Sequence, residues 1–391
     1  MIPQGCVPEC PACPHREWSR EESESQKLRF LSARLAQVVG PDLIESVRGP
    51  VDSRRWAYRE KTCLHVRWTE AAGWCFGLLQ RRPRMRDPEL VAIPDCPIHS
   101  KRVRDIVRAL TDSLPESGPG EFPLAFVLIT GSLVTLVLKS KSRPARLPSE
   151  TSLREAGVSG LLLNLNPSAG RRVLSTRAWH PVWGAAREID LQGLKYGPDS
   201  FQQLLRELYS DALDEAESFL DPGQDDRVLD LYCGSGASLK RWQKRGVRWI
   251  GVELGGEAVE CAAENLGGSA RILRGRVSDR LPQLGDFLAE GGGERVVAFV
   301  NPPRTGLERE VCAWLGERAR PARLVYLSCS PGTLSRDLSI LCQSDYAVRR
   351  IIPYDFFPQT HHIEALAELE LDRVPPLRGP VAERSLARPD G

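Results

Sequence analysis

The sequence predicts an α/β protein with an N-terminal cysteine-rich segment, a central α+β domain and a C-terminal Rossmann-like domain. Closely spaced cysteines stand near the N-terminus, short strand-like segments fill the middle, and apolar strands alternate with helical segments in the C-terminal half. Strands that alternate with helices around a glycine turn are typical of a doubly wound parallel sheet. We place these parts at residues 1–46, 47–189 and 190–370, followed by a Pro-, Arg- and Gly-rich tail over 371–391 that we expect to be disordered.

The composition is that of a globular protein and excludes several functional classes. The 391 residues are 41% hydrophobic and 27% charged, with a net charge of +2, which does not by itself indicate a nucleic-acid partner. No apolar run approaches the roughly 20 residues that span a bilayer, and no signal peptide opens the chain. We therefore expect a cytoplasmic monomer without a membrane partner. Eleven cysteines in such a chain favour metal binding or catalysis over disulfides.

Three cysteines near the N-terminus have the spacing of a metal site. Cys6, Cys10 and Cys13 are separated by three and then two residues, among prolines that would keep the segment in turns. A fourth ligand is needed, and Cys96 is the candidate because it also stands beside a proline; His15 is the alternative. The spacing does not decide between an iron–sulfur cluster and zinc, and three unrelated thiols remain the other interpretation.

The first 189 residues otherwise predict one helix followed by a mixed domain. Ser19–Val39 has leucines at helical spacing behind a plausible N-cap. The middle predicts an antiparallel sheet with a helix around Val103–Leu110 and a hairpin turn at Thr130–Ser132. Its expected strands are Cys63–Trp68, Trp74–Leu79, Ala125–Ile129, Leu133–Leu138 and Gly160–Leu165.

Basic loops in this middle domain suit RNA. They are Arg81–Arg86, Lys101–Arg104 and Lys139–Arg146, and tryptophans lie near them in the sequence. Phosphate contacts from arginine and stacking on aromatic rings are how proteins hold single-stranded RNA. A solvated basic face with core tryptophans would have the same pattern, so this observation leaves both interpretations open.

The C-terminal domain begins with the elements of a nucleotide site. A helix is expected over Asp199–Leu220, and Arg227–Gly236 predicts a strand that enters a glycine turn, where Gly234 lets the backbone approach a ligand. The next strand, Trp249–Glu253, ends in a carboxylate about 20 residues later, the usual place of a ribose-binding acid. The spacing Asp-x-x-x-Gly-x-Gly without a third glycine favours S-adenosylmethionine; a dinucleotide is the alternative.

Two more loops of this domain follow predicted strands. Asp279 stands after the strand Ala270–Val277 and either accepts a hydrogen bond from an adenine amino group or caps the next helix. Asn301 opens the loop Asn301–Gly306 after the apolar strand Val296–Val300. We expect this proline-rich loop to form a rigid wall beside the methyl donor.

Two residues are candidates for the chemistry itself. The strand Leu324–Leu327 ends just before Cys329 in a Ser-Cys-Ser-Pro-Gly loop, which favours a nucleophile over a small buried hydrophobe. Glu364 leads into another apolar strand and follows two histidines. A carboxylate in that position can face the site as a general base, and a solvated loop acid is the alternative.

Taken together, the motifs resemble those of the RNA uracil-5-methyltransferases that use S-adenosylmethionine. The matches are Ser200–Gln203, Asp230–Gly236, Glu253, Asn301–Gly306, Tyr326–Leu334 with Arg336 and Asp337, and Phe357–Glu364. The proline-rich loop has no cysteine, which favours uracil over cytosine as the target base. Asn301 stands where many members have aspartate, Ala237 replaces asparagine or glycine, and the gap between Cys6 and Cys10 is short. No β-barrel domain precedes the cysteines, as in the shorter branch that modifies large-subunit ribosomal RNA.

The resemblance implies a class I methyltransferase fold and a role for each matched residue. Cys329 would be the nucleophile and Glu364 the base. Residues implied to contact the donor are Gln203, Tyr232, Glu253 and Asn301, and those implied to hold a four-iron four-sulfur cluster are Cys6, Cys10, Cys13 and Cys96. The expected activity is methylation of carbon 5 of a uridine, in 23S ribosomal RNA rather than transfer RNA. The alternatives are a transfer RNA enzyme, a cytosine methyltransferase, and a non-catalytic RNA-binding iron–sulfur protein.

Overall fold

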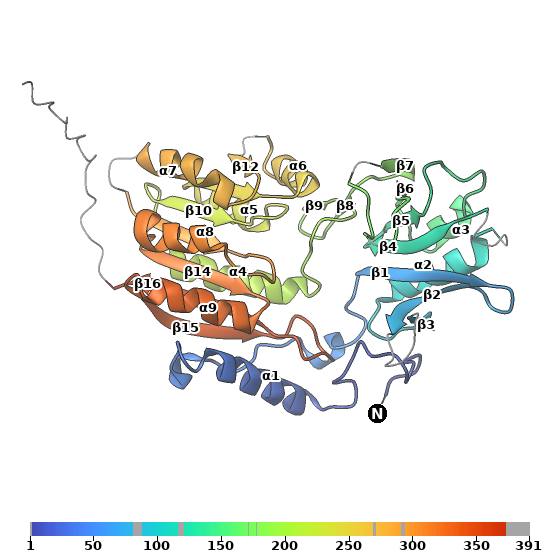
Figure 1. The fold of residues 1–391 in the computed structure, drawn as a ribbon, viewed down its shortest axis with the longest axis horizontal. Helices are drawn as coiled ribbons and strands as arrows, with labels where there is room; N and C mark the ends of the chain where they lie inside the picture. The colour runs from blue at the N-terminus through green and yellow to red at the C-terminus, as the bar shows by residue number, and fades with distance from the viewer. Residues whose placement is uncertain are drawn as a thin grey trace, which may run out of the picture.

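The computed structural model describes residues 2–80, 88–115, 121–170, 172–176, 178–268, 271–290 and 294–372. Within these ranges the strands form two seven-stranded sheets and a two-stranded ribbon. Figure 1 shows the two sheets side by side with the ribbon, β8 (Glu188–Ile189) and β9 (Lys195–Tyr196), between them. The predicted basic loop over 81–86 lies outside the described residues, as does the predicted disordered tail 371–391 except for its first two residues. Leu371 was wrongly placed in that tail, because it is the last residue of strand β16 (Glu364–Leu371).

The central sheet has the strand order β3-β2-β1-β4-β5-β6-β7. The turn predicted at Thr130–Ser132 joins β4 to β5, with Gly131 at a φ of 59°. Strands β5 and β6 pair in parallel rather than antiparallel as expected, because a crossover through helix α3 connects them. The elements are β1 (Lys61–Thr69), β2 (Gly73–Gln80), β3 (Glu89–Ala92), β4 (Leu124–Thr130), β5 (Leu133–Leu138), β6 (Gly160–Leu165), β7 (Trp179–Gly184), α2 (Lys101–Ser113) and α3 (Glu150–Glu155).

The C-terminal sheet has the order β12-β11-β10-β13-β14-β16-β15, and β16 runs antiparallel to both of its neighbours. Its strands are β10 (Arg227–Leu231), β11 (Arg248–Glu253), β12 (Ile272–Arg274), β13 (Val296–Val300), β14 (Arg323–Ser328), β15 (Tyr346–Tyr354) and β16 (Glu364–Leu371). Its helices are α4 (Arg206–Leu220), α5 (Ala237–Arg245), α6 (Gly256–Asn265), α7 (Leu281–Ala289), α8 (Arg309–Trp314) and α9 (Pro331–Cys342). Because β10 and β13 are adjacent and parallel, the loops that follow them open at the same edge.

The predicted N-terminal helix exists but packs against the C-terminal sheet. Helix α1 (Arg20–Leu35) begins at a capping box formed by Ser19 and Glu22, and it ends four residues before the predicted Val39. Leu31 and Leu35 are fully buried in the same hydrophobic core as β15 and α9. Figure 1 shows α1 running below β15. The N-terminal segment is therefore built into the side of the C-terminal domain.

Helix α4 begins at Arg206, seven residues later than the predicted Asp199. The preceding residues are irregular and are held by the central domain. Thr130 Oγ1 donates a hydrogen bond to the carbonyl oxygen of Pro198 (2.8 Å), and Lys61 Nζ donates one to that of Ser200 (2.5 Å). These tertiary contacts outweigh the amphipathic pattern, and they leave residues 201–203 free to line a cavity.

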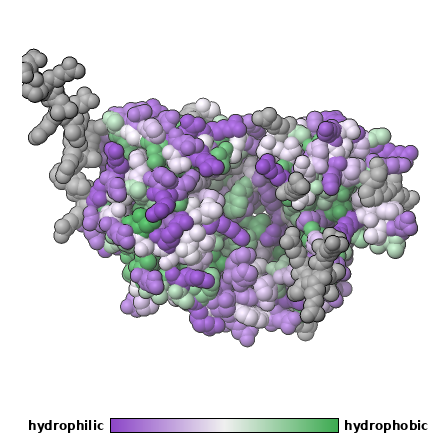
Figure 2. Space-filling model, viewed as in Figure 1, coloured by the Kyte–Doolittle hydropathy of each residue, from purple (hydrophilic) through white to green (hydrophobic). Residues whose placement is uncertain are grey.

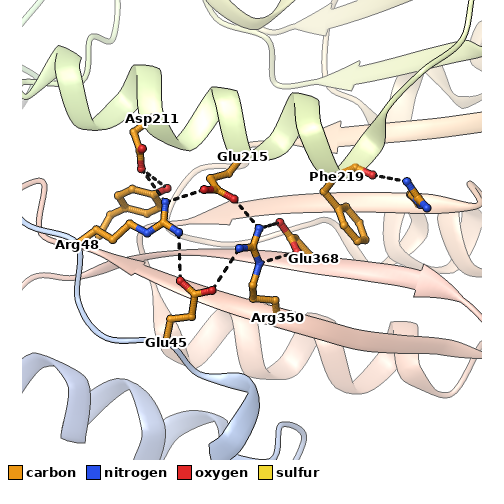
Figure 3. Close-up of polar contacts among 9 residues, drawn as sticks. Glu45, Arg48, Asp211, Glu215, Phe219, Arg350 and Glu368 are labelled. Carbon is orange, nitrogen blue, oxygen red and sulfur yellow. Dashed lines mark hydrogen bonds and ion pairs between the residues drawn. The ribbon is translucent and has the colours of Figure 1, made fainter.

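An ion-pair network fastens α4 and the N-terminal segment to the last two strands (Figure 3). Arg350 on β15 contacts Glu45, Glu215 and Glu368 at 3.2, 2.5 and 2.6 Å. Arg48 contacts Glu45, Asp211 and Glu215, and its backbone bridges to Tyr354. The network thus joins three segments that are far apart in the sequence.

The surface between the two sheets is hollowed on the face drawn in Figure 2, and hydrophobic residues are visible inside the hollow. The described helices include none that is long and apolar enough to cross a membrane.

Candidate active site

The strand register places Cys329 beside Glu364. In the antiparallel pair β14–β16, Ser328, the last residue of β14, lies opposite Ala365. Cys329 directly follows Ser328, and Glu364 directly precedes Ala365, so the antiparallel register places these two residues next to each other. Cys329 is half-buried at the mouth of the loop, whereas the side chain of Glu364 is buried. The sheet therefore brings together the two predicted catalytic side chains, which are 35 residues apart in the sequence.

The electrostatics of this pair involve a third residue, Arg304. Burial is the main cause that raises the pKa of the Cys329 thiol, and the charge of Glu364 raises it further, while Arg304 lowers it through its charge and a hydrogen bond. Burial raises the pKa of Glu364 to about 8, against a hydrogen bond from Gln203 and the charge of Arg304. Arg304 lies within the predicted loop Asn301–Gly306, but its sequence position alone did not predict a role for it; a cation inside a rigid loop after a central strand was the available signal.

Gln203 holds the Glu364 carboxylate from the irregular segment before α4. Its Nε2 donates to Glu364 Oε2 at 3.1 Å, and its Oε1 is buried without a hydrogen-bond partner. A buried amide oxygen that lacks a partner is costly. Gln203 is therefore in place to accept a hydrogen bond from a ligand while it orients the carboxylate.

A cavity of about 780 Å³ connects this pair with the glycine turn. It is lined by the predicted residues Cys329, Glu364, Gln203, Tyr232, Gly234, Glu253 and Asn301. Asp279 does not line it: this residue is exposed in the short 3₁₀ turn Ser278–Arg280, and the following helix has no side-chain cap. Phe201, which is 64% exposed, also contributes to the wall.

The glycine turn is shaped by Glu253 and Tyr232. Glu253 Oε2 accepts a hydrogen bond from the Gly234 amide at 3.0 Å, so the carboxylate at the end of β11 also fixes the turn after β10. Tyr232 has a positive φ of 63°, unusual for a residue with a side chain, and its hydroxyl donates to Glu308. The Ser235 hydroxyl oxygen is buried beside the cavity without a partner. The turn therefore offers unpaired polar groups to a ligand.

The loop that carries Arg304 is supported from below by Asp337. This buried carboxylate accepts from the Leu307 amide at 2.9 Å and from the Tyr326 hydroxyl at 2.8 Å. Asn301 begins the loop, and its backbone N–H donates a hydrogen bond to the carbonyl oxygen of Leu231 at 3.2 Å. The loop is thus tied to β10, β14 and α9.

The four predicted cysteine ligands line a second, smaller cavity. Cys6, Cys10, Cys13 and Cys96 surround a space of about 180 Å³. Burial raises the pKa of Cys13 to about 12, with further contributions from Cys96, Cys10 and Cys6, as expected when the sulfurs are neighbours. His15, the alternative ligand, does not line this space: its Nδ1 is hydrogen-bonded to Ser23 Oγ and its ring stacks on Trp18.

The sulfur atoms are gathered but do not form a ligand shell in this structure. In the part of the chain that the structure describes, no group of three or more His, Cys, Asp or Glu side chains is arranged to hold a metal ion. The four thiols therefore share one cavity, but their side chains are not arranged around a metal centre.

Comparisons with known proteins agree with the motifs. A family model described as tRNA (uracil-5-)-methyltransferase matches residues 293–371. A 23S rRNA (uracil(1939)-C(5))-methyltransferase RlmD of Pseudomonas fluorescens is 29% identical over 376 residues, which cover 92% of this chain and 78% of the relative. An uncharacterized RNA methyltransferase of Nostoc sp. is 34% identical over 252 residues, 62% of this chain and 53% of the relative.

Among solved structures, the tRNA (uracil-54, C5)-methyltransferase of Pyrococcus abyssi in complex with S-adenosyl-L-homocysteine is similar over most of its length. The TM-score is 0.69 at 21% identity, with 92% of this chain and 85% of that chain covered. This match confirms the predicted fold class: an α/β chain whose C-terminal sheet and helices have the class I methyltransferase fold.

Proposed function

We propose that this chain, which is similar to RNA uracil-5-methyltransferases in its motifs and in the comparisons, transfers a methyl group from S-adenosylmethionine to carbon 5 of a uridine in RNA. The observation that carries the proposal is the pairing of Cys329 with Glu364 inside the cavity that also holds the glycine turn. A thiol, a buried carboxylate and a donor site in one cavity fit a reaction that needs a nucleophile, a base and a methyl donor.

The donor would lie along the glycine turn. Gly234 and Glu253 would hold its nucleoside, and Tyr232, Asn301 and Gln203 would line the part nearer to Cys329. The unpaired polar atoms Ser235 Oγ and Gln203 Oε1 fit a ligand rich in donors and acceptors. When bound, S-adenosylmethionine supplies an electrophilic methyl group. Asp279 lies away from the cavity lining, and its proposed contact with adenine depends on an approach from the rim.

Cys329 would activate the base. Its thiolate adds to carbon 6 of uracil: a sulfur–carbon bond forms, and the electrons of the carbon 5–carbon 6 double bond move toward the carbonyl oxygen on carbon 4. Carbon 5 thereby becomes nucleophilic and would bond to the methyl group, while the methyl–sulfur bond of the donor breaks with its electrons left on the sulfur of S-adenosylhomocysteine. Arg304, which lowers the pKa of Cys329, favours the thiolate needed for this step. The uridine must leave its stack to reach the thiol, so a loop or an already flipped nucleotide is the expected target.

Glu364 would complete the reaction as general base. It takes the proton from carbon 5, the double bond to carbon 6 re-forms, and the sulfur–carbon bond breaks with its electrons returning to Cys329. Gln203 keeps the carboxylate oriented during this step. Because burial raises the pKa of Glu364 to about 8, the ionised form that can accept the proton increases as the pH rises through that value.

The proposed substrate is 23S ribosomal RNA. The relative that covers 92% of this chain is named for that RNA, whereas the matching family model and solved structure are named for transfer RNA. Basic residues of the central domain, among them Lys101, Arg102 and the segment 139–146, would contact phosphates.

The small cavity would hold a four-iron four-sulfur cluster through Cys6, Cys10, Cys13 and Cys96. Four thiolates complete the ligand set of such a cluster, and they would equally suit zinc. Bound there, the cluster would cross-link residues 6–13 to the turn at Cys96. Iron, sulfide and zinc analysis of protein purified without oxygen distinguishes the two, and a protein without either would overturn this part.

Tritium release tests the activity. Purified protein, S-adenosylmethionine and [5-³H]uridine-labelled 23S ribosomal RNA or transfer RNA are combined, and released tritium is measured. We expect release from 23S RNA; release from transfer RNA alone would overturn the substrate, and release from neither would overturn the activity. A Glu364→Gln enzyme should accumulate a covalent RNA adduct, which peptide mass spectrometry would locate on Cys329. An adduct at another residue would contradict the mechanism.

A further inference from the structure

The loop between β15 and β16, residues 355–363, borders both cavities. Phe357, His362 and Ile363 line the large cavity next to Glu364, whereas Thr360 lines the cysteine cavity. The loop therefore forms a wall of the reaction site on one side and of the cysteine site on the other.

Groups from the N-terminal 58 residues hold this loop. The carbonyl oxygens of three successive loop residues each accept a hydrogen bond: Phe357 from Lys27 Nζ at 3.2 Å, Pro358 from the Tyr58 hydroxyl at 3.1 Å, and Gln359 from the His15 amide at 3.0 Å. Gln359 has a positive φ of 68°, a conformation that side chains disfavour. Such a backbone persists only when its surroundings fix it.

Lys27 is the most costly of these contacts to bury. Its Nζ lies 2.6 Å from Asp355 Oδ1, and the two side chains are 0% and 2% exposed. Removing two charges from water is expensive, and apolar residues of similar size often stabilise a fold as well or better. A gain in stability therefore does not explain why this buried ion pair is present. Its geometry does: Lys27 holds both Asp355, the first residue of the loop, and the carbonyl oxygen of Phe357.

We propose that Lys27 is a positioning residue for proton removal. Through Asp355 and the Phe357 carbonyl, it keeps the 355–363 loop closed over Glu364, so that the carboxylate meets carbon 5 of the bound base. Cys329 is less dependent on this loop, because Glu364 directly continues the loop in the chain, whereas Cys329 follows β14 on a separate segment. Loss of Lys27 should therefore slow the step that Glu364 performs more than the addition of Cys329. This inference rests on the proposed function and adds the N-terminal segment to the support of the active site.

The test uses the full-length protein with Lys27→Met, which keeps the length of the side chain, and Arg34→Met as the matched control. Arg34 lies on the same helix, is exposed, and has its guanidinium 5.3 Å from the Phe30 ring. We expect Lys27→Met to lower kcat by about 10-fold to 100-fold with a small change in the KM for RNA. The fraction of enzyme trapped as RNA adduct should rise toward that of Glu364→Gln, and Arg34→Met should behave as the wild type.

A double variant separates positioning from stability. Lys27→Met with Asp355→Asn leaves no buried charge unpaired, so it should fold even if Lys27→Met alone does not. Slow turnover with accumulated adduct in the double variant supports the proposal. Wild-type turnover in it, or an adduct that declines together with turnover, overturns the proposal. If wild-type protein releases tritium and Glu364→Gln traps the adduct, either result concerns Lys27 only; if they do not, the proposed function itself has failed.

Discussion

The two cavities of this protein are both lined by cysteine thiols, but the fold builds them in different ways. In the large cavity, Cys329 follows β14 and Glu364 begins the neighbouring strand β16, so strand register brings the two side chains together. In the small cavity, the thiols come from turns at residues 6–13 and at Cys96, held by helices and loops of other segments. The first arrangement pairs a thiol with a base, and the second gathers thiols with one another.

The difference also appears in the charges around each thiol. Burial and the charge of Glu364 raise the pKa of Cys329, but Arg304 beside it opposes that rise through its charge and a hydrogen bond. Cys233 lines the same cavity, but burial and the carboxylates of Asp230 and Glu253 raise its pKa. Because the thiolate is the reactive form, the position at the end of β14 and the neighbouring Arg304 distinguish Cys329 from the buried thiol of Cys233.

The largest expected effect is that cysteine substitutions in the two cavities change different properties: activity in the large cavity and stability in the small one. Cys329→Ala should lower turnover by about 10⁴-fold or more, since nothing replaces the nucleophile, while its melting temperature stays near that of the wild type. Cys13→Ala should mainly lower the melting temperature and the bound metal. Cys342→Ala, at the end of α9 and away from both cavities, is the control for both measurements. Equal loss of activity in Cys329→Ala and Cys13→Ala, without any loss of stability, would contradict the assignment of a catalytic thiol to one cavity and structural thiols to the other.

The large cavity was the more predictable of the two from the sequence. Its residues stand at strand ends, where a short apolar run followed by Gly, Pro or Ser identifies both the strand and the loop. The sequence did not predict that α4 starts at Arg206, because Lys61 and Thr130 in another domain fix the preceding segment. Nor did it predict that α1 packs on the C-terminal sheet, since helical periodicity gives the buried face and not the partner.

The loop that borders both cavities can be released by breaking the buried ion pair between Lys27 and Asp355. Lys27→Met leaves Asp355 as an uncompensated buried charge and should lower the free energy of unfolding by about 3–5 kcal/mol, with most of it recovered in Lys27→Met/Asp355→Asn. The exposed pair Lys101–Asp105 is the control, where Lys101→Met should cost at most about 0.5 kcal/mol because the lysine is 83% exposed. Denaturant titration measures both. A double variant no more stable than the single one would show that the charges are not coupled.

Glu364 should make the reaction cavity sensitive to pH. Its folded pKa of about 8 lies above the ordinary 4.5, so the folded state keeps a proton that the unfolded state loses, and stability falls as the pH rises from 4.5 through 8. Glu364→Gln has no proton to lose and should be more stable than the wild type by about 5 kcal/mol at pH 9, with little difference at pH 4. Parallel melting curves for the two proteins across this range would contradict the burial of an ionisable carboxyl.

The same variant should shift the pH dependence of adduct formation. The charge of Glu364 raises the pKa of Cys329, so Glu364→Gln removes one cause of that rise and leaves the effect of Arg304. The thiolate should then form at lower pH, and the adduct should appear at a pH below that at which wild-type turnover increases. Stopped-time gel assays of adduct against pH measure this. A midpoint at higher pH in Glu364→Gln would mean that the two groups do not interact.

The smallest expected effect concerns the network in Figure 3, which supports the sheet at a distance from both cavities. Arg350 is 32% exposed and contacts three carboxylates, so Arg350→Met should cost about 1 kcal/mol of stability, less at high salt because the ions screen it. Glu368 and Glu364 lie on the same face of β16, four residues apart. Turnover should nevertheless stay within about twofold of the wild type, because Gln203 and the 355–363 loop hold Glu364 independently of Arg350. Arg349→Met, on the neighbouring exposed position, is the control. A large loss of turnover in Arg350→Met but not in Arg349→Met would show that the position of Glu364 depends on Arg350 through β16.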